Sequence, residues 1–183
     1  MNAEAQKGFT LIEFIIALAV AAVLLTFAVP TFSTVTMNKR ITAQTNDFVS
    51  TLALARAEAL KRVSRVTVCS SANGTACAGS GGWQQGWIVF ADDDNDGTRD
   101  NGEDILRFRS ALEGGNTLWG SSNVASYVSY VASGTTKLTS GALQAGTLAL
   151  CDERGSGENA RAITIHATGR ARVESMGPVT CMP

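Results

Sequence analysis

The sequence contains a single histidine, His166, and lacks the short motifs that mark the common catalytic sites. With one histidine, Ser-His or Cys-His pairs can be built around one position at most, and no serine stands in a Gly-x-Ser-x-Gly turn. A phosphate-binding loop and a dinucleotide-binding glycine pattern are also absent. His166 alternates with isoleucines, which is typical of an ordinary strand residue. We therefore predict that the protein is not an enzyme.

Neither sign of charge is in excess, since the 183 residues carry a formal net charge of −1. A chain with this balance lacks the overall basic surface that marks many nucleic-acid-binding proteins. With 45% hydrophobic residues, 18 glycines and only 3 prolines, the composition indicates a globular chain. The length allows one modest domain plus an anchor and leaves no room for a second core.

The charges are unevenly distributed along the chain. Seven of the 16 acidic residues lie in the thirteen positions 92–104, and the rest of the chain is net basic. Basic side chains concentrate in residues 39–65 and again in residues 154–172. The first group is typical of a solvated or lipid-headgroup-facing surface, and nucleic-acid binding is the alternative.

Residues 9–29 contain one charged side chain, Glu13, among 21 positions. As a helix, this run spans about 30 Å, which is the thickness of the hydrocarbon core of a bilayer. Its leucine, isoleucine, valine and phenylalanine residues favour insertion by roughly 4 to 8 kcal/mol, against about 3 kcal/mol for a central carboxylate. The run predicts a membrane anchor, which alone does not explain why Glu13 is present.

Residues 7–13, Lys-Gly-Phe-Thr-Leu-Ile-Glu, resemble the prepilin peptidase motif of type IV pilins and type II secretion pseudopilins. The resemblance implies that residues 1–8 are a leader, which prepilin peptidase removes by cutting between Gly8 and Phe9, and that Phe9 is then N-methylated. It also implies that Glu13 neutralises the N-terminal amine of a neighbouring subunit, which supplies the cation that an intramembrane carboxylate needs. A secretory signal peptide or a plain signal anchor is the alternative.

The apolar periodicity continues beyond the anchor. Pro30 stands where the span would leave the membrane, a position at which pilins commonly carry a proline. Spacings of three and four then predict an amphipathic helix over residues 31–63. Its apolar stripe consists of Ile41, Thr45, Phe48, Leu52, Ala55, Ala59 and Val63. A helix over residues 9–62 would be roughly 80 Å long, too long for a bilayer, so its second half must pack on a globular domain.

After Ser64 the pattern changes to short runs that alternate between apolar and polar residues. We expect strands at residues 66–69, 87–90, 105–109, 127–131, 147–151, 163–166 and 171–173. Residues 114–146 are rich in glycine, serine and threonine, which favours loop or irregular hairpin. The predicted fold class is α+β, a long helix packed on an antiparallel β-sheet domain of residues 64–183.

Further motifs resemble the FimT/FimU and GspH group of minor pilins and pseudopilins. They are Arg56-x-Glu58-Ala59, Val66-Thr67-Val68-Cys69, Trp83-x-x-Gly86-Trp87-Ile88-Val89-Phe90-x-Asp92 and Thr168-Gly169-Arg170. Together with the N-terminus, the resemblance covers most of the chain. It implies a type IV pilin-like fold, with residues 9–30 in the membrane or in the core of a filament.

The four cysteines, Cys69, Cys77, Cys151 and Cys181, form no Cys-x-x-Cys pair. An even number in an exported chain favours two disulfides over a metal site, with free buried thiols as the alternative. Of the three pairings we favour Cys69–Cys77 and Cys151–Cys181, because each pair flanks a loop-like stretch. By restricting the unfolded chain, the two disulfides should stabilise the fold by roughly 2.5 and 3.5 kcal/mol, respectively.

Residues 92–103 match the twelve-residue calcium-loop pattern Asp-x-Asp/Asn-x-Asp/Asn-Gly-x5-Glu in full. The expected ligands are the carboxylates of Asp92, Asp94, Asp96 and Glu103 and the carbonyl oxygen of Thr98. The flanking residues predict strands and not the two helices of an EF-hand, so an exposed acidic hairpin tip is the alternative. Calcium is the one candidate cofactor.

The segment Gly169-Arg170-Ala171-Arg172 matches the Gly-Arg-x-Arg motif of FimT-like pilins, which is proposed to bind DNA in natural transformation. On a strand, Arg170 and Arg172 would project to the same side, and guanidinium groups suit phosphate geometry. With Arg161 nearby, two or three phosphates could be contacted, which predicts weak and salt-dependent binding of double-stranded DNA. A structural or filament-contact role is the alternative.

The resemblance implies a minor pilin of a type IV pilus, a structural subunit that helps to initiate the filament and packs with other major and minor pilins. It also implies a single pass through the inner membrane with the globular domain in the periplasm. The alternative is a GspH-type minor pseudopilin of a type II secretion system. DNA uptake is a further function that is compatible with the first.

Overall fold

The computed structural model describes residues 8–155, 159–175 and 181, without the side chains of residues 27–30 and 175. The long helix α1 (Leu11–Arg62) is followed by strands and two short 3-10 helices, η1 (Trp83–Gln85) and η2 (Ser122–Val124). The chain divides into two compact units, Met1–Asn38 and Lys39–Pro183, so α1 belongs to both. Of the leader predicted for residues 1–8, all but Gly8 falls outside the described residues.

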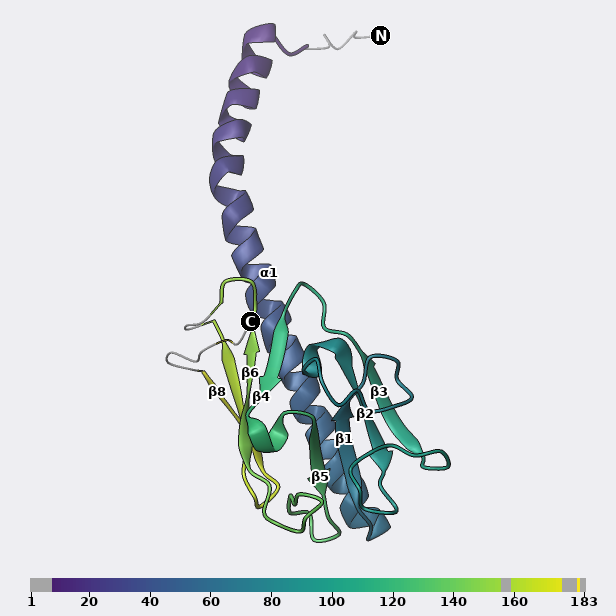
Figure 1. Cartoon of the computed structure of the whole chain (residues 1–183). Coiled ribbons are helices and arrows are strands. Elements are labelled where there is room, and N and C mark those ends of the chain that lie inside the picture. The colour runs from purple at the N-terminus through teal and green to yellow at the C-terminus, as the bar shows by residue number, and fades with distance from the viewer. Residues whose placement is uncertain (1–7, 156–158, 176–180, 182–183) are drawn as a thin grey trace, which may run out of the picture. The chain divides into compact units, whose positions relative to one another are not determined.

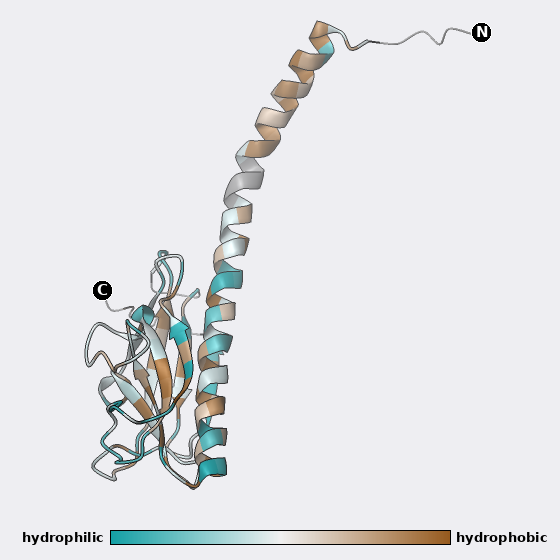
Figure 2. Ribbon diagram, turned by 90° about the vertical axis from the view of Figure 1, so that its right-hand side faces the viewer, coloured by the Kyte–Doolittle hydropathy of each residue, from teal (hydrophilic) through white to brown (hydrophobic). Residues whose placement is uncertain are grey.

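The first unit contains the apolar part of α1. The helix continues through position 30, so Pro30 does not end it. The leucine, isoleucine, valine and phenylalanine side chains between residues 11 and 25 are 53–78% exposed, and Figure 2 shows these turns in the hydrophobic colour. Within the described residues, α1 is the one helix long and apolar enough to cross a membrane. Such a surface requires lipid or other apolar helices around it.

The second unit contains two four-stranded antiparallel sheets, which lie to one side of residues 39–62 of α1 (Figure 1). The first sheet has the order β3-β2-β1-β5 and the second has the order β4-β6-β7-β8. The strands are β1 (Val66–Ser70), β2 (Gly86–Ala91), β3 (Ile105–Ser110), β4 (Thr117–Gly120), β5 (Tyr127–Tyr130), β6 (Gly146–Cys151), β7 (Arg161–Ile165) and β8 (Ala171–Ser175). The predicted α+β fold is confirmed, and β4 is the strand that the sequence did not predict.

The predicted stripe of α1 enters the core of the second unit. Its fully buried members are Ile41, Phe48, Leu52, Ala55 and Ala59. Thr45 is also buried, and its hydroxyl is satisfied there because it donates to the Ile41 carbonyl oxygen at 2.7 Å. The prediction is wrong for Val63, which follows the end of α1 with a φ of 54° and is 75% exposed. The main core lies between residues 41 and 171, so the second unit has a core of its own.

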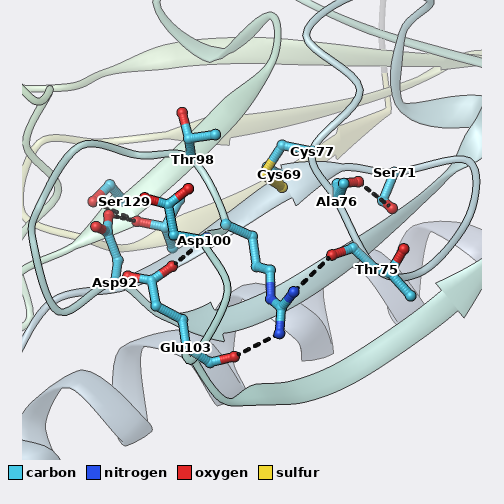
Figure 3. Close-up of a disulfide and its surroundings, with 12 residues drawn as sticks. Cys69, Ser71, Thr75, Ala76, Cys77, Asp92, Thr98, Asp100, Glu103 and Ser129 are labelled. Carbon is cyan, nitrogen blue, oxygen red and sulfur yellow. Dashed lines mark hydrogen bonds between the residues drawn. A yellow bond between two sulfur atoms is a disulfide. The ribbon is translucent and has the colours of Figure 1, made fainter.

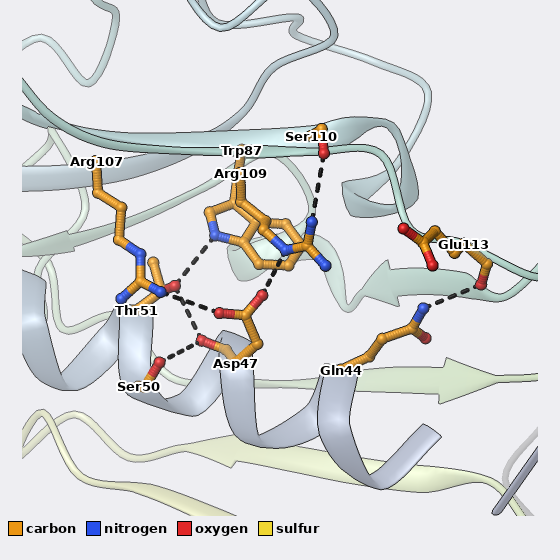
Figure 4. A network of polar contacts seen from close by, with 9 residues as sticks. All are labelled: Gln44, Asp47, Ser50, Thr51, Trp87, Arg107, Arg109, Ser110 and Glu113. Atoms are coloured by element: carbon orange, nitrogen blue, oxygen red, sulfur yellow. Dashed lines mark hydrogen bonds and ion pairs between the residues drawn. The ribbon is translucent and has the colours of Figure 1, made fainter. Parts of the chain in front are cut away.

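A polar contact joins α1 to the edge strand β3 (Figure 4). The Asp47 carboxylate accepts hydrogen bonds from Arg107 Nη2 at 3.1 Å and from Arg109 Nε at 2.6 Å. One turn further along α1, the Thr51 hydroxyl accepts a hydrogen bond from Trp87 Nε1 at 3.2 Å. Both arginines are about one-third exposed, so water screens the ion pairs. The contact therefore orients the helix on the first sheet more than it stabilises the fold.

Both disulfides are present in the pairing that the loop positions favoured. Cys69, in β1, is joined to Cys77 in the loop that precedes η1. Cys151, the last residue of β6, is joined to Cys181. None of the four cysteines is a free thiol.

Candidate functional site

Thr10 and Glu13 cap the N-terminus of α1. The backbone N–H and the hydroxyl of Thr10 each donate to Glu13 Oε2 at 3.0 Å, and the Glu13 N–H donates back to the Thr10 hydroxyl at 3.3 Å. This reciprocal arrangement is a capping box. Gly8 and Phe9 precede the helix and are exposed, so the peptide bond between them is accessible. The chain thus holds the Glu13 carboxylate at the helix end that follows the predicted cleavage site.

The Gly-Arg-x-Arg segment forms the turn between β7 and β8. The two strands pair antiparallel, with Ile165 opposite Ala171. Gly169 has a φ of 80°, and a Cβ at this position would collide with the Gly134 carbonyl oxygen. Both the backbone conformation and the available space therefore require glycine in this turn.

Arg170 and Arg172 line one surface groove of about 320 Å³, together with His166 and Thr168. All four side chains are exposed. This groove, called the arginine groove below, does not include Arg161. Arg161 lies at the other end of β7, opposite Ser175, and its guanidinium donates to the carbonyl oxygens of Asn159 and Ala160. The structure thus brings two of the three predicted arginines together.

Sequence reasoning did not connect Arg56 with this turn. Arg56 lies on α1 and donates through Nη1 to the Gly169 carbonyl oxygen at 3.4 Å. It lines a second groove of about 210 Å³ with Gly169 and Arg170. The motif Arg56-x-Glu58-Ala59 indicated only the resemblance to the family. It gave no indication that Arg56 contacts Gly169, which lies 113 positions further along the chain. A third guanidinium therefore supports the turn from the side of the helix.

The acidic loop between β2 and β3 brings three carboxylates together. One oxygen from each of Asp92, Asp94 and Asp96 lies within 4.8 Å of the other two. Glu103 is engaged differently, since Oε1 accepts the Asp93 N–H at 2.9 Å. Its Oε2 accepts the Asp100 N–H at 2.8 Å (Figure 3). Burial raises the pKa of Glu103. Burial also raises the pKa of Asp92, against the opposing effect of hydrogen bonds.

Two family models match the chain. The model described as type II transport protein GspH matches residues 44–169, which is more than half of the chain. The chain belongs to the GspH family. The model described as the prokaryotic N-terminal methylation motif matches residues 5–29, a segment that includes Gly8, Phe9 and Glu13. Arg170 and Arg172 lie just beyond the segment that the GspH model matches.

Solved structures show that this GspH-family chain shares the pilin-like fold. Two crystal forms of the type IV minor pilin FimU from Pseudomonas aeruginosa align with TM-scores of 0.59 and 0.54 at 19% and 20% identity. They cover 79% and 75% of this chain and 96% of theirs. The minor pseudopilin EpsH from the type 2 secretion system of Vibrio cholerae aligns with a TM-score of 0.49 at 14% identity, covering 74% of this chain and 97% of its own. No curated protein sequence matches significantly.

Membership of the GspH family confirms the predicted class of minor pilins and pseudopilins. These proteins are structural subunits and not enzymes. Membership also implies assembly with other pilins or pseudopilins in a filament, and the exposed apolar turns of α1 offer the surface for it.

Proposed function

We propose that this chain is a minor pilin of a type IV pilus, a structural subunit that helps to initiate and assemble the filament. Prepilin peptidase cuts after Gly8, and the chain then spans the inner membrane with its second unit in the periplasm. The observation that carries the proposal is the exposure of α1 in the first unit. Its leucine, isoleucine, valine and phenylalanine side chains between residues 11 and 25 are more than half exposed. Lipid covers these side chains first, and neighbouring pilin helices cover them in the filament.

Moving α1 from lipid into a bundle of helices exchanges one apolar contact for another, so it provides little driving force by itself. A specific polar interaction is needed, and Glu13 offers it. In surroundings of low dielectric constant, a carboxylate next to the N-terminal amine of a neighbour interacts far more strongly than in water. The capping box holds the Glu13 carboxylate at the helix N-terminus, where such an amine would approach. The pair would fix the axial register between subunits.

The second candidate is a GspH-type minor pseudopilin of a type II secretion system, which the description of the matching family model favours. Deletion of the gene separates the two functions. We expect the deletion strain to lose surface pili and to secrete proteins normally, and the intact gene to restore piliation. Retention of exported proteins in the periplasm, with normal piliation, would assign the chain to secretion instead.

The arginine groove supports a second role for the pilin, the binding of double-stranded DNA. Arg170 and Arg172 are exposed and line one groove, and the other lining residues, His166 and Thr168, carry no negative charge at neutral pH. Glu174, further along β8, is also exposed and opposes the two positive charges. Two phosphate contacts, or three with Arg56, give weak affinity and a strong dependence on salt.

This role predicts that the second unit, expressed from Lys39 onward, binds a short DNA duplex in fluorescence anisotropy at low salt. Neutralising two or three phosphates should lower the affinity roughly 10- to 40-fold between 50 and 200 mM salt. The Arg170→Gln/Arg172→Gln variant should lose most of the binding. The control Lys39→Gln/Lys61→Gln removes the same charge from exposed positions on α1 and should bind as the wild type does. Equal losses in both variants, or no wild-type binding at 50 mM salt, would rule out the groove as a DNA site.

A further inference from the structure

The acidic loop between β2 and β3 holds three carboxylates around one point. Asp92, Asp94 and Asp96 each place an oxygen within 4.8 Å of the other two. Asp94 Oδ1 accepts the Asp96 N–H at 3.2 Å, and Asp96 Oδ1 accepts the Thr98 N–H at 2.6 Å. Those bonds use one oxygen of each exposed carboxylate. Three like charges at this distance repel one another unless a cation lies between them.

The buried position of the Asp92 carboxylate favours an ion independently of the clustering. The Asp92 side chain is 0% exposed, and Oδ2 accepts a hydrogen bond from the Thr67 hydroxyl at 2.6 Å. Its other oxygen, Oδ1, is buried and accepts no hydrogen bond of normal geometry from the described residues, although the backbone N–H of Gly97 lies near the carboxylate. A buried polar atom without a partner costs about 1–3 kcal/mol, and more when the group is charged. An ion that Asp92 coordinates through Oδ1 would satisfy this oxygen.

We propose that residues 92–103 bind one calcium ion. Calcium takes six to eight oxygen ligands and accepts carboxylates, carbonyl oxygens and water together. The loop offers such ligands in the order of a calcium-binding loop, namely the carboxylates of Asp92, Asp94 and Asp96 and the carbonyl oxygen of Thr98. Gly97, at the sixth position, has a φ of 79° and permits the sharp turn. Glu103, at the twelfth position, closes the loop through the Asp93 and Asp100 amides.

Two arginines, Arg99 within the loop and Arg65 beside it, moderate the affinity. Arg65 Nε donates to the Asn95 side-chain oxygen at 3.1 Å, and Arg99 Nη2 donates to the Glu103 carbonyl oxygen at 3.1 Å. Their positive charge offsets part of the field of the acidic residues. We therefore expect a dissociation constant of about 10⁻⁴ to 10⁻³ M, in the range of extracellular calcium modules.

The loop also contacts the segment that the first disulfide closes. Asp96, Gly97 and Thr98 line a groove of about 250 Å³ that Cys69 and Cys77 also line. Figure 3 shows Thr98 and the two cysteines. Arg99 Nη1 donates to the Thr75 carbonyl oxygen at 3.4 Å, within the segment that the disulfide closes. A bound ion would therefore order the acidic loop and the disulfide loop together. This consequence is independent of the filament that the chain joins.

The test titrates calcium into the full chain in detergent micelles, after removal of metal with a chelator. We expect a saturable heat that corresponds to one ion per chain, and a higher melting temperature with calcium. Asp94→Asn/Asp96→Asn should weaken binding by about tenfold or more, since it removes two charged ligands. The control Asp93→Asn/Asp104→Asn removes two exposed charges from the same acidic stretch but no proposed ligand. It should bind calcium within about threefold of the wild type if the ligands, and not the net charge, decide affinity.

Three outcomes would overturn the proposal. The first is the absence of heat and of any change in melting temperature at millimolar calcium. The second is an equal loss of affinity in both double variants, which would show diffuse attraction of cations to an acidic surface. The third is magnesium binding as tight as calcium binding. All four substituted residues are exposed, so each variant is expected to fold.

Discussion

Glu13→Gln is expected to reduce incorporation of the chain into filaments by about tenfold or more, while the amount in the membrane stays unchanged. Glutamine at the third position of a helix can still make capping-box hydrogen bonds, so this variant removes the charge and preserves the helix start. The interaction lost is the ion pair with the amine of a neighbouring subunit. A loss of about 1.4 kcal/mol per subunit is sufficient for a tenfold effect. Immunoblots of sheared filaments and of the membrane fraction measure the two amounts.

Thr10→Ala is the matched control for Glu13→Gln. It removes the hydroxyl that bonds with Glu13 and leaves the carboxylate in place. Loss of an N-cap costs about 1 kcal/mol of helix stability, but it does not remove the charge that binds a neighbour. We expect Thr10→Ala to incorporate much better than Glu13→Gln. The reverse order would show that Glu13 acts as a helix cap and not as a partner of the amine.

The parts of the fold that the sequence predicts are those in which burial follows a simple period. In α1 the buried residues recur at spacings of three and four, so the packed face from Ile41 to Ala59 was recognisable. The failure at Val63 has a local cause, because the helix ends at Arg62 and the next residue turns the chain with a positive φ. Period alone does not show where a helix ends.

The segment of residues 114–146 shows no such period. The buried side chain of Gln144 organises part of it instead. Gln144 is 0% exposed, and its Oε1 accepts the Ser129 N–H at 2.9 Å. Its Nε2 donates to the carbonyl oxygens of Asn123 and Tyr127 at 2.8 and 3.0 Å. A side chain that satisfies backbone groups from two earlier stretches leaves no repeating pattern. The order between η2 and β5 was therefore not predicted. β4 was missed for another reason, since it has only four residues and shows too little alternation to be recognised.

The candidate sites show the same division between local and distant contacts. Gly8, Phe9 and Glu13 form a local motif, and Arg170 and Arg172 are separated by one residue, so sequence sufficed to group them. Arg161 was grouped with the two arginines because it lies nearby in sequence. It stands four residues before Ile165 on β7, and at about 3.3 Å per residue this is roughly 13 Å from the turn. Arg56 reaches the turn from α1, a contact that depends on tertiary packing.

Phe48→Ala is expected to lower the free energy of unfolding of the second unit by about 3–5 kcal/mol. Phe48 is fully buried on α1, and its ring lies edge-on to two buried indoles at centroid distances of 5.2 Å to Trp83 and 5.0 Å to Trp87. Such pairs contribute about 0.5–1.5 kcal/mol each beyond the burial of area. Urea denaturation of the fragment that begins at Lys39 measures the loss.

Phe108→Ala makes the same substitution on the edge strand β3, where the ring is 48% exposed. It removes less buried area and no aromatic pair, so its cost should be less than half that of Phe48→Ala. Phe48 connects α1 to Trp83 and to Trp87 of β2. Its loss should therefore weaken the attachment of the helix to the first sheet as well as the core. Equal costs for the two variants would show that the aromatic cluster is not what holds α1 on this sheet.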